Sequence, residues 1–188
     1  MKRLGYNRFV AQGGDWGAII TEVWGSQAPP ELAGIHTNMP NAIPVDINAA
    51  AFSGAAAPVN LSAEERHAFD QLSFFYKHVY YGFIMGDRPQ TLMAFADSPV
   101  GLASFMLDHD ARSLELIERS FNGVREGLTR DDVLDNITLF WLTNTAISAA
   151  RLYWENKLGF FTPRNVSVPV VATASPDDLY TTPRSWAE

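Results

Sequence analysis

The fold is decided by one stretch of sequence, Arg8–Ala18, which reads RFVAQGGDWGA. Its first part, Arg8–Gln12, is a short apolar run that leads into glycines, as expected of a buried parallel strand. Gly13–Gly17 then predicts a tight turn, because glycine adopts backbone conformations that other residues avoid. Ala18–Trp24 has the composition of a short helix. The stretch therefore predicts a strand that turns sharply into a helix.

The sequence beyond this stretch extends it into an α/β pattern. The helix is expected to end at Gly25, and a second apolar run, Leu32–Met39, predicts the next strand and completes a strand–helix–strand unit. Near the end of the chain, the β-branched run Val166–Ala172 predicts one more strand. Ala42–Asn60 is rich in Ala, Pro and Asn, which is typical of a loop or linker.

The middle of the chain is predicted to be helical. Ser62–Glu65 has the form of a capping box and opens a helix that runs towards Tyr81. Pro99 stands in the first turn of another helix, and Thr129 caps a third that is expected to continue towards Tyr153. We therefore expect two sheet-forming pieces, residues 1–41 and 161–188, to flank an inserted helical lid at residues 42–160.

Composition restricts the classes of partner. The chain has 14 Lys and Arg against 21 Asp and Glu, a net charge of −7, which argues against nucleic acid or an anionic membrane. It has no cysteine, so disulfides, a thiolate nucleophile and cysteine-bound metals are excluded. Met1–Arg3 is not followed by an apolar run as in a secretory signal, and no apolar stretch is long enough to span a bilayer. We expect a cytoplasmic protein, and the oligomeric state stays open.

The residue with the clearest chemical meaning is Asp15. Gly13-x-Asp15-x-Gly17, between a strand and a helix, has the form of a nucleophile elbow with Asp in place of Ser. The helix start offers backbone N–H groups and a positive dipole end that keep a carboxylate ionised. The simpler interpretation is that Asp15 only caps the helix.

An aspartate nucleophile restricts the reaction. A serine that opened an epoxide would form an ether, which water does not readily cleave, whereas a carboxylate forms an ester that activated water can release. The chemistry therefore points to displacement at an alkyl carbon, in an epoxide or at a carbon–halogen bond.

Several stretches resemble one family in the order in which that family has them. Gly5–Ala18 and His36–Pro40 resemble the elbow region of microsomal-type epoxide hydrolases and their bacterial relatives, and so do Arg88–Leu92, Asp97–Ala103 and Ile147–Asn156 for the lid. The resemblance covers nearly the whole chain. It implies a partial α/β-hydrolase fold with an inserted helical lid, cut at both ends, and hydrolysis of a small apolar epoxide to a vicinal diol without a cofactor.

The resemblance also implies roles for two lid tyrosines. In the family, two such tyrosines hydrogen-bond the epoxide oxygen and help to protonate the leaving alkoxide. By position they match Tyr81 and Tyr153, with Tyr80 and Tyr76 as neighbours of the first. A neutral phenol with a pKa of about 10 suits this role. Trp16, next to the nucleophile, is assigned to substrate binding.

The family places a carboxylate after the strand that follows the lid, where it orients a base histidine. Position favours Asp178 over Asp177 here, and a solvated turn is the simpler interpretation of both. No histidine follows Asp178, so we expect the chain as written to show no steady-state turnover of epoxides. The four histidines, which are interpreted as structural or surface residues and show no metal-binding spacing, are His36, His67, His78 and His109.

Two alternatives stay open. A haloalkane dehalogenase uses the same fold with Asp followed by Trp at the elbow, and there ring N–H groups hold the halide, so Trp16 alone does not decide. A non-catalytic relative used for binding is the other alternative. The pair of tyrosines and the lid stretches favour the epoxide.

Overall fold

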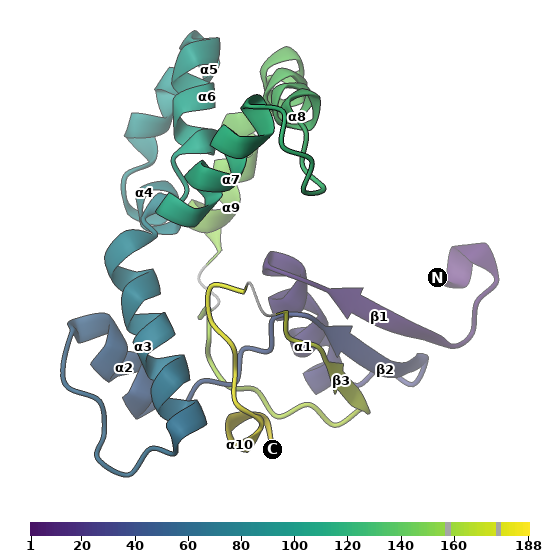
Figure 1. The fold of residues 1–188 in the computed structure, drawn as a ribbon. Coiled ribbons are helices and arrows are strands. Elements are labelled where there is room, and N and C mark those ends of the chain that lie inside the picture. The colour runs from purple at the N-terminus through teal and green to yellow at the C-terminus, as the bar shows by residue number, and fades with distance from the viewer. Residues whose placement is uncertain (157–158, 176–177) are drawn as a thin grey trace. The chain divides into compact units, whose positions relative to one another are not determined.

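The structure, a computed structural model, describes residues 1–156, 159–175 and 178–188. It divides into two compact units, which are considered one at a time (Figure 1). The first contains Met1–Tyr76 and Leu158–Glu188, and the second contains Lys77–Lys157. These units are defined by packing alone. The assignment of residues 42–160 to a lid therefore stays a prediction.

A small parallel sheet organises the first unit. Its strands are β1 (Phe9–Gly13), β2 (Leu32–Thr37) and β3 (Val170–Ala172), in the order β1-β2-β3. Both strand pairs are parallel, with Ala11 opposite Ile35 and His36 opposite Val171. Together with the helices this confirms the predicted partial α/β fold. All three strands therefore end at the same edge of the sheet.

The helix α1 (Trp16–Gln27) packs on β1 and β2. It does not stop at Gly25 as predicted. A Cβ at Gly25 would come within 2.7 Å of Val166 Cγ1 and 3.3 Å of Ile35 Cδ1, so this glycine permits close packing inside the helix. The helix instead ends at Ala28, whose φ is 44°.

A short helix precedes β1, and the last strand of the sheet is also short. The 3-10 helix η1 (Lys2–Leu4) ends at Gly5, whose φ of 80° is the left-handed conformation that glycine favours at a helix end. β3 is shorter than the predicted Val166–Ala172, because Pro169 has no N–H to give to a ladder. The carbonyl of Pro169 nevertheless accepts a hydrogen bond from Ile35 N at 2.9 Å.

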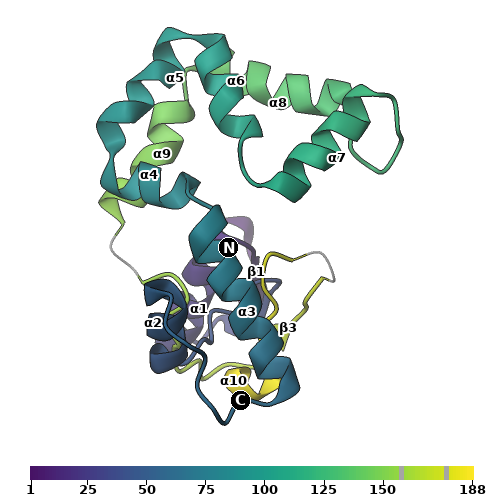
Figure 2. The same ribbon diagram turned by 60° about the vertical axis from the view of Figure 1, so that its left-hand side comes forward.

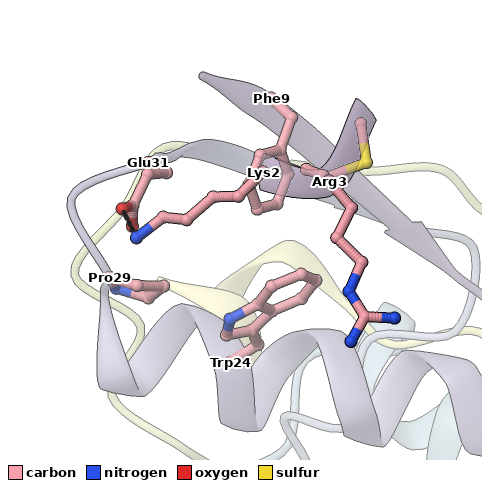
Figure 3. A pocket seen from close by; sticks show the side chains of 7 residues that line it. Lys2, Arg3, Phe9, Trp24, Pro29 and Glu31 are labelled. Atoms are coloured by element: carbon pink, nitrogen blue, oxygen red, sulfur yellow. Dashed lines mark ion pairs between the residues drawn. The ribbon is translucent and has the colours of Figure 1, made fainter. Parts of the chain in front are cut away.

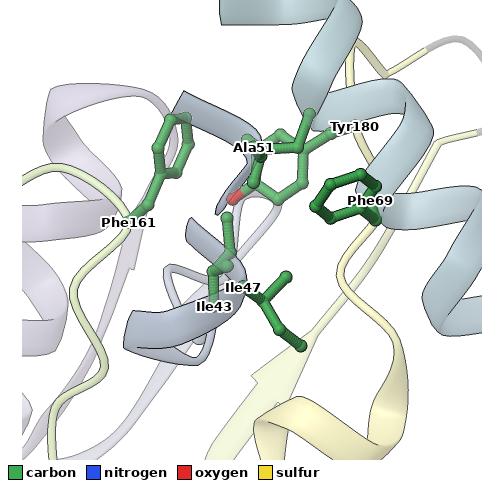
Figure 4. Close-up of a cluster of buried hydrophobic side chains, with 7 residues drawn as sticks. Ile43, Ile47, Ala51, Phe69, Phe161 and Tyr180 are labelled. Atoms are coloured by element: carbon green, nitrogen blue, oxygen red, sulfur yellow. The ribbon is translucent and has the colours of Figure 1, made fainter. Parts of the chain in front are cut away.

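The largest buried cluster of the first unit joins two helices to the C-terminal segment. The predicted loop Ala42–Asn60 is wrong, because α2 (Val45–Ser53) lies within it and ends at Gly54. Burial every fourth residue favours this helix over a loop. The buried residues of the cluster, most of which Figure 4 labels, are Ile43, Ile47, Ala51, Phe69, Leu72, Phe161 and Tyr180.

The capping box at Ser62 is confirmed. Glu65 N donates to Ser62 Oγ at 3.2 Å, and Ser62 N donates to Glu65 Oε2 at 2.8 Å. The helix that follows, α3 (Ala63–His78), ends three residues before Tyr81. Near the C-terminus, α10 (Arg184–Ala187) returns to α3 through a hydrogen bond from Ser185 Oγ to Glu65.

The second unit is helical in its described residues (Figure 2). Leu92, Phe95, Leu102 and Ala150 form its buried cluster. Its elements are α4 (Tyr81–Asp87), η2 (Pro89–Met93), α5 (Ala94–Asp97), α6 (Pro99–Leu107), α7 (Ala111–Phe121), α8 (Arg130–Thr143) and α9 (Ala146–Glu155).

The helix predicted from Thr129 towards Tyr153 is two helices. Thr129 caps the start of α8 as predicted, and it forms a capping box with Asp132. The helix is broken at Asn144, whose φ of 52° ends α8, and α9 begins two residues later. Asparagine tolerates the left-handed region better than most residues, so this stop had a sequence signal. In the described part of the chain, no helix has both the length and the apolar character needed to cross a membrane.

Candidate active site

The turn between β1 and α1 holds Asp15 in an unusual backbone conformation. Asp15 has φ 50° and ψ −128°, outside the common regions for a residue with a side chain. Such conformations cost about 1–3 kcal/mol and cluster at functional sites. The side chain is exposed and makes no capping hydrogen bond to α1. This geometry is that of a strand-to-helix elbow rather than of an ordinary cap.

Gly13 and Gly14 lie in this turn with other atoms close to where their side chains would be. A Cβ at Gly13 would overlap the carbonyl oxygen of Gly17, so the backbone of the first helical turn folds tightly against the strand end. A Cβ at Gly14 would overlap the side chain of Asn38, which follows β2. Gly17 itself has open space around its Cβ position. A residue without a side chain is therefore needed at Gly13, whereas a Cβ at Gly14 would require the Asn38 side chain to move and a Cβ at Gly17 would meet open space.

Trp16 follows the candidate nucleophile and is buried. Its ring meets the edge of Phe160 with centroids 5.0 Å apart. The next residue, Phe161, has φ 60° and is buried in the cluster of Figure 4. An aromatic residue with this φ is a rare outlier. The backbone conformation of Phe161 sets the direction of the chain at Phe160, whose ring packs against Trp16. No sequence signal marked the contact between Phe160 and Trp16.

A buried ion pair anchors the elbow helix to the rest of the first unit. The carboxylate of Glu22, on α1, accepts hydrogen bonds from Asn41 N (2.9 Å) and Asn41 Nδ2 (3.1 Å) and lies 3.5 Å from Arg164 Nη1. Arg164 also donates to the carbonyls of Gly159 (2.8 Å) and Thr162 (3.1 Å). Burial raises the pKa of Glu22, and the hydrogen bonds from Asn41 and the charge of Arg164 oppose this.

Asp178 lies in a turn after β3. Its Oδ2 accepts a hydrogen bond from Ser175 N at 2.7 Å, and its own N–H donates to Ser175 O at 3.1 Å. β1 and β3 are parallel to β2, so the loops that carry Asp15 and Asp178 leave the same edge of the sheet, where ligands of α/β sheets bind. Asp177 lies outside the described residues.

The second unit brings the two candidate tyrosines together. Tyr81 opens α4 and Tyr153 lies on α9, and their ring centroids are 6.0 Å apart at 79°. Tyr80 is exposed, and its hydroxyl donates to the Lys77 carbonyl. Tyr76 belongs to the first unit, where its hydroxyl donates to Asn48 Oδ1 at 2.5 Å and burial raises its pKa to about 12. The ring of Tyr81 thus contacts that of Tyr153, as the proposed pairing of the two tyrosines requires.

His109 also contacts Tyr81, with ring centroids 4.7 Å apart and 33° between the planes. His109 Nδ1 is 2.5 Å from Oδ2 of Asp110. Burial would raise the pKa of Asp110, but hydrogen bonds from Ser113 and His109 outweigh it and hold that pKa at about 2. The sequence could have marked this site, because a His–Asp pair directly precedes a helix there.

This lowered pKa predicts an acid-dependent loss of stability. A carboxylate whose pKa falls from 3.8 to about 2 on folding stabilises the folded state above pH 4, and this contribution disappears as the pH falls through 2. The shift is equivalent to about 2 kcal/mol. Urea unfolding of the wild type and Asp110→Asn, followed by circular dichroism, should differ by about that amount at pH 5 and converge near pH 2. A difference that is independent of pH would contradict the prediction.

Three further histidines and a cavity near the N-terminus are separate from the groups described above, although His36 is at the carboxyl end of β2, the same edge of the sheet as Asp15. His67 and His78 are exposed on α3, and His36 Nε2 pairs with Thr173 Oγ1 at 3.2 Å. A cavity of about 380 Å³ lies at the amino end of β1, the opposite end from Asp15, and Figure 3 shows the side chains that line it. Its lining residues are Met1, Lys2, Arg3, Phe9, Trp24, Pro29 and Glu31. Among the described residues, no group of three His, Asp or Glu side chains is arranged to hold a metal ion.

Known proteins resemble this chain in sequence and in fold. A protein of Stigmatella aurantiaca named as an epoxide hydrolase is 38% identical over 100% of this chain and 40% of its own length. Epoxide hydrolase 1 of Oryctolagus cuniculus is 29% identical over 99% of this chain and 44% of its own length. The crystal structure of juvenile hormone epoxide hydrolase from the silkworm Bombyx mori matches 98% of this chain and 40% of that chain, with a TM-score of 0.60 and 25% identity.

No family model matches the chain. The chain spans about 40% of the length of the curated relatives it matches. Both kinds of comparison agree on one group of proteins, and the resemblance expected from the sequence is confirmed. Over its whole length the chain is therefore similar to a part of proteins named epoxide hydrolases, and its fold is a partial α/β-hydrolase fold.

Proposed function

We propose that this chain supplies the nucleophile and the oxygen-binding tyrosines of an epoxide hydrolase that opens small apolar epoxides to vicinal diols. The observation that carries the proposal is the backbone of Asp15, with φ 50° on a tight strand-to-helix turn at the start of α1. A carboxylate held there is presented at the carboxyl edge of the sheet beside backbone N–H groups. The names of the relatives support the same reaction, the hydrolysis of an ether bond.

The proposed reaction has two steps. One carboxylate oxygen of Asp15 attacks an epoxide carbon, the C–O bond of the ring breaks, and the alkoxide formed takes a proton from Tyr81 or Tyr153. This leaves an alkyl ester of Asp15 and a β-hydroxyl group. Water then attacks the ester carbonyl and the ester C–O bond breaks. One proton of the water goes to the departing oxygen, which releases the diol, and the other returns to the tyrosinate, so that the carboxylate and the phenol are both restored. Asp178 is proposed to orient the histidine that activates this water, and no histidine follows it in the chain.

The proposed site has an apolar side. Next to Asp15 in the chain, the buried ring of Trp16 packs against Phe160, so the residues that follow the nucleophile are aromatic and apolar. Apolar residues of this kind fit an apolar epoxide better than a polar one. Hydrolysis of a carbon–halogen bond would not need two phenols, so the contact of Tyr81 with Tyr153 favours the epoxide over a halide. A cytoplasmic location stays a prediction from the sequence.

The proposal is tested in a completed chimera, in which residues 1–188 replace the matching region of the Stigmatella aurantiaca relative. Styrene oxide should give phenylethanediol, whereas 1-bromobutane should release no bromide. Bromide release without diol would indicate a dehalogenase, and neither product from a folded chimera would indicate a non-catalytic relative. The 188-residue chain gives a second measurement, because peptide mass spectrometry should find the mass of styrene oxide added at Asp15.

Removing one phenol hydroxyl should slow ring opening. Tyr81→Phe or Tyr153→Phe in the completed chimera should raise the barrier to ester formation by about 2–4 kcal/mol, the range for one donor to a developing oxyanion. Rapid-quench measurement of the ester checks this. Tyr80→Phe is the matched control, because the hydroxyl of Tyr80 is bound to the Lys77 carbonyl. An equal loss in the Tyr80 variant would remove the support for Tyr81.

A further inference from the structure

Tyr81 contacts the aromatic rings of both Tyr153 and His109 in the second unit. The Tyr153 ring is nearly perpendicular to it at 6.0 Å, and the His109 ring is tilted by 33° at 4.7 Å. Tyr81 is the first residue of α4, and His109 lies between α6 and α7. A histidine from a different part of the chain therefore packs against the ring of Tyr81.

The carboxylate of Asp110 contacts the His109 ring at Nδ1. The carboxylate of Asp110 is 3% exposed, and an ionised carboxylate can only accept, so the proton at the 2.5 Å contact belongs to His109 Nδ1. The same Oδ2 accepts from Ser113 Oγ at 2.7 Å. The other oxygen, Oδ1, accepts from Arg112 N (2.9 Å) and Ser113 N (3.1 Å) at the start of α7.

The two oxygens of the Asp110 carboxylate therefore have different functions. Capping of α7 uses Oδ1 alone, and an asparagine could provide it equally well. Oδ2 is left to hold His109 and Ser113. At the start of α8, Thr129 Oγ1 accepts from Asp132 N and Asp132 Oδ2 accepts from Thr129 N, so this helix is capped by a threonine and an aspartate without a histidine. Helix capping alone therefore does not account for the His109–Asp110 pair.

We propose that Asp110 and His109 are positioning residues that fix the ring of Tyr81 against Tyr153, so that both phenols are preorganised for one epoxide oxygen. This inference rests on the proposed function of the two tyrosines. A donor that is already oriented loses no free energy to reorganisation when charge develops on the oxygen. Misplacing such a group by about 1 Å costs on the order of 100-fold in rate.

The kinetic test is a double-mutant cycle on ester formation in the completed chimera, with styrene oxide as substrate. His109→Ala should lower the maximal rate of ester formation by about 10- to 100-fold, with little change in the styrene oxide concentration that gives half of that rate. In a Tyr81→Phe background, His109→Ala should cause no further loss. His109→Phe, which keeps a flat ring, should recover part of the rate. Losses that multiply across the two sites would overturn the proposal.

Asp110→Asn separates positioning from capping. It keeps a good N-cap residue and removes the carboxylate that holds His109, so the rate should fall nearly as far as in His109→Ala. Asp132→Asn is the matched control and should leave the rate unchanged. If Asp110→Asn lowers only the melting temperature and not the rate, Asp110 is merely a cap and the proposal fails.

A spectroscopic measurement on the 188-residue chain does not depend on catalysis. With ¹³C-labelled tyrosine rings, His109→Ala should shift the Tyr81 ring resonances and speed the flipping of that ring, while the Tyr6 resonances of the first unit stay unchanged. Unchanged Tyr81 resonances would overturn the positioning role. If they change but Tyr81→Phe leaves ester formation unaffected, the proposed function of Tyr81 fails and the positioning contact stands.

Discussion

Asp15→Asn in the completed chimera is expected to abolish formation of the covalent ester and to lower diol production by about 10⁴-fold or more, as for the loss of other catalytic nucleophiles. The reason is that a neutral amide cannot displace the oxygen of an epoxide at a useful rate. The backbone of the elbow should be retained, because asparagine tolerates a positive φ at least as well as aspartate.

The measurement combines intact-mass detection of the ester with chromatographic analysis of the diol. Asp46→Asn is the matched control, because Asp46 is an exposed first-turn residue of α2 in the same unit. It should leave both steps unchanged. Substantial ester formation in a correctly folded Asp15→Asn variant would mean that another residue is alkylated.

Glu22→Ala should have the largest effect on stability. The change leaves the Arg164 guanidinium and the Asn41 amide without their carboxylate partner in a buried site. Breaking a buried pair in this way costs about 3–5 kcal/mol, because the remaining charge is uncompensated. The effect should spread to the elbow, since Glu22 lies on the helix that Asp15 begins.

Amide hydrogen exchange localises this loss of stability. Peptides from α1 and β2 should lose protection in Glu22→Ala, while peptides from α8 in the second unit should not. Asp70→Ala is the control, because its ion pair with Arg66 is exposed on both sides and is worth about 1 kcal/mol or less. If Glu22→Ala were no more destabilising than Asp70→Ala, the buried pair would not anchor the elbow helix.

The parts of the fold that local patterns control were predicted correctly. The elbow follows from the order of apolar residues and glycines around Asp15, and the capping boxes at Ser62 and Thr129 follow from a serine or threonine three residues before an acid. Each signal lies within one short stretch of chain. The strand–helix–strand unit of the first unit was predictable for the same reason.

The errors arose where the tertiary structure determines the role of a residue. Gly25 looked like a helix stop and instead allows Val166 and Ile35 to approach α1. The Ala-rich segment after Asn41 looked like a loop and instead places Ile47 and Ala51 in a buried cluster. Sequence reasoning had no access to these neighbours, which are distant in the chain.

In the candidate site too, the residue with a local motif was predictable and the contacts between distant parts of the chain were not. Asp15 could be found from its own motif, whereas Tyr81 and Tyr153 needed the family resemblance, since either tyrosine alone looks like a packed helix residue. The contact of His109 with Tyr81 was missed, because no spacing relates a histidine after α6 to the first residue of α4.

Direct attack of Asp15 on the epoxide can be distinguished from attack by water in a single-turnover reaction in heavy-oxygen water. With the completed chimera in excess over styrene oxide, the first diol should carry an unlabelled oxygen from the Asp15 carboxylate, because water attacks only the ester carbonyl afterwards. The label should then be found in Asp15, and later diols should acquire it. Full incorporation of the label into the first diol would show direct attack by water and would contradict the account.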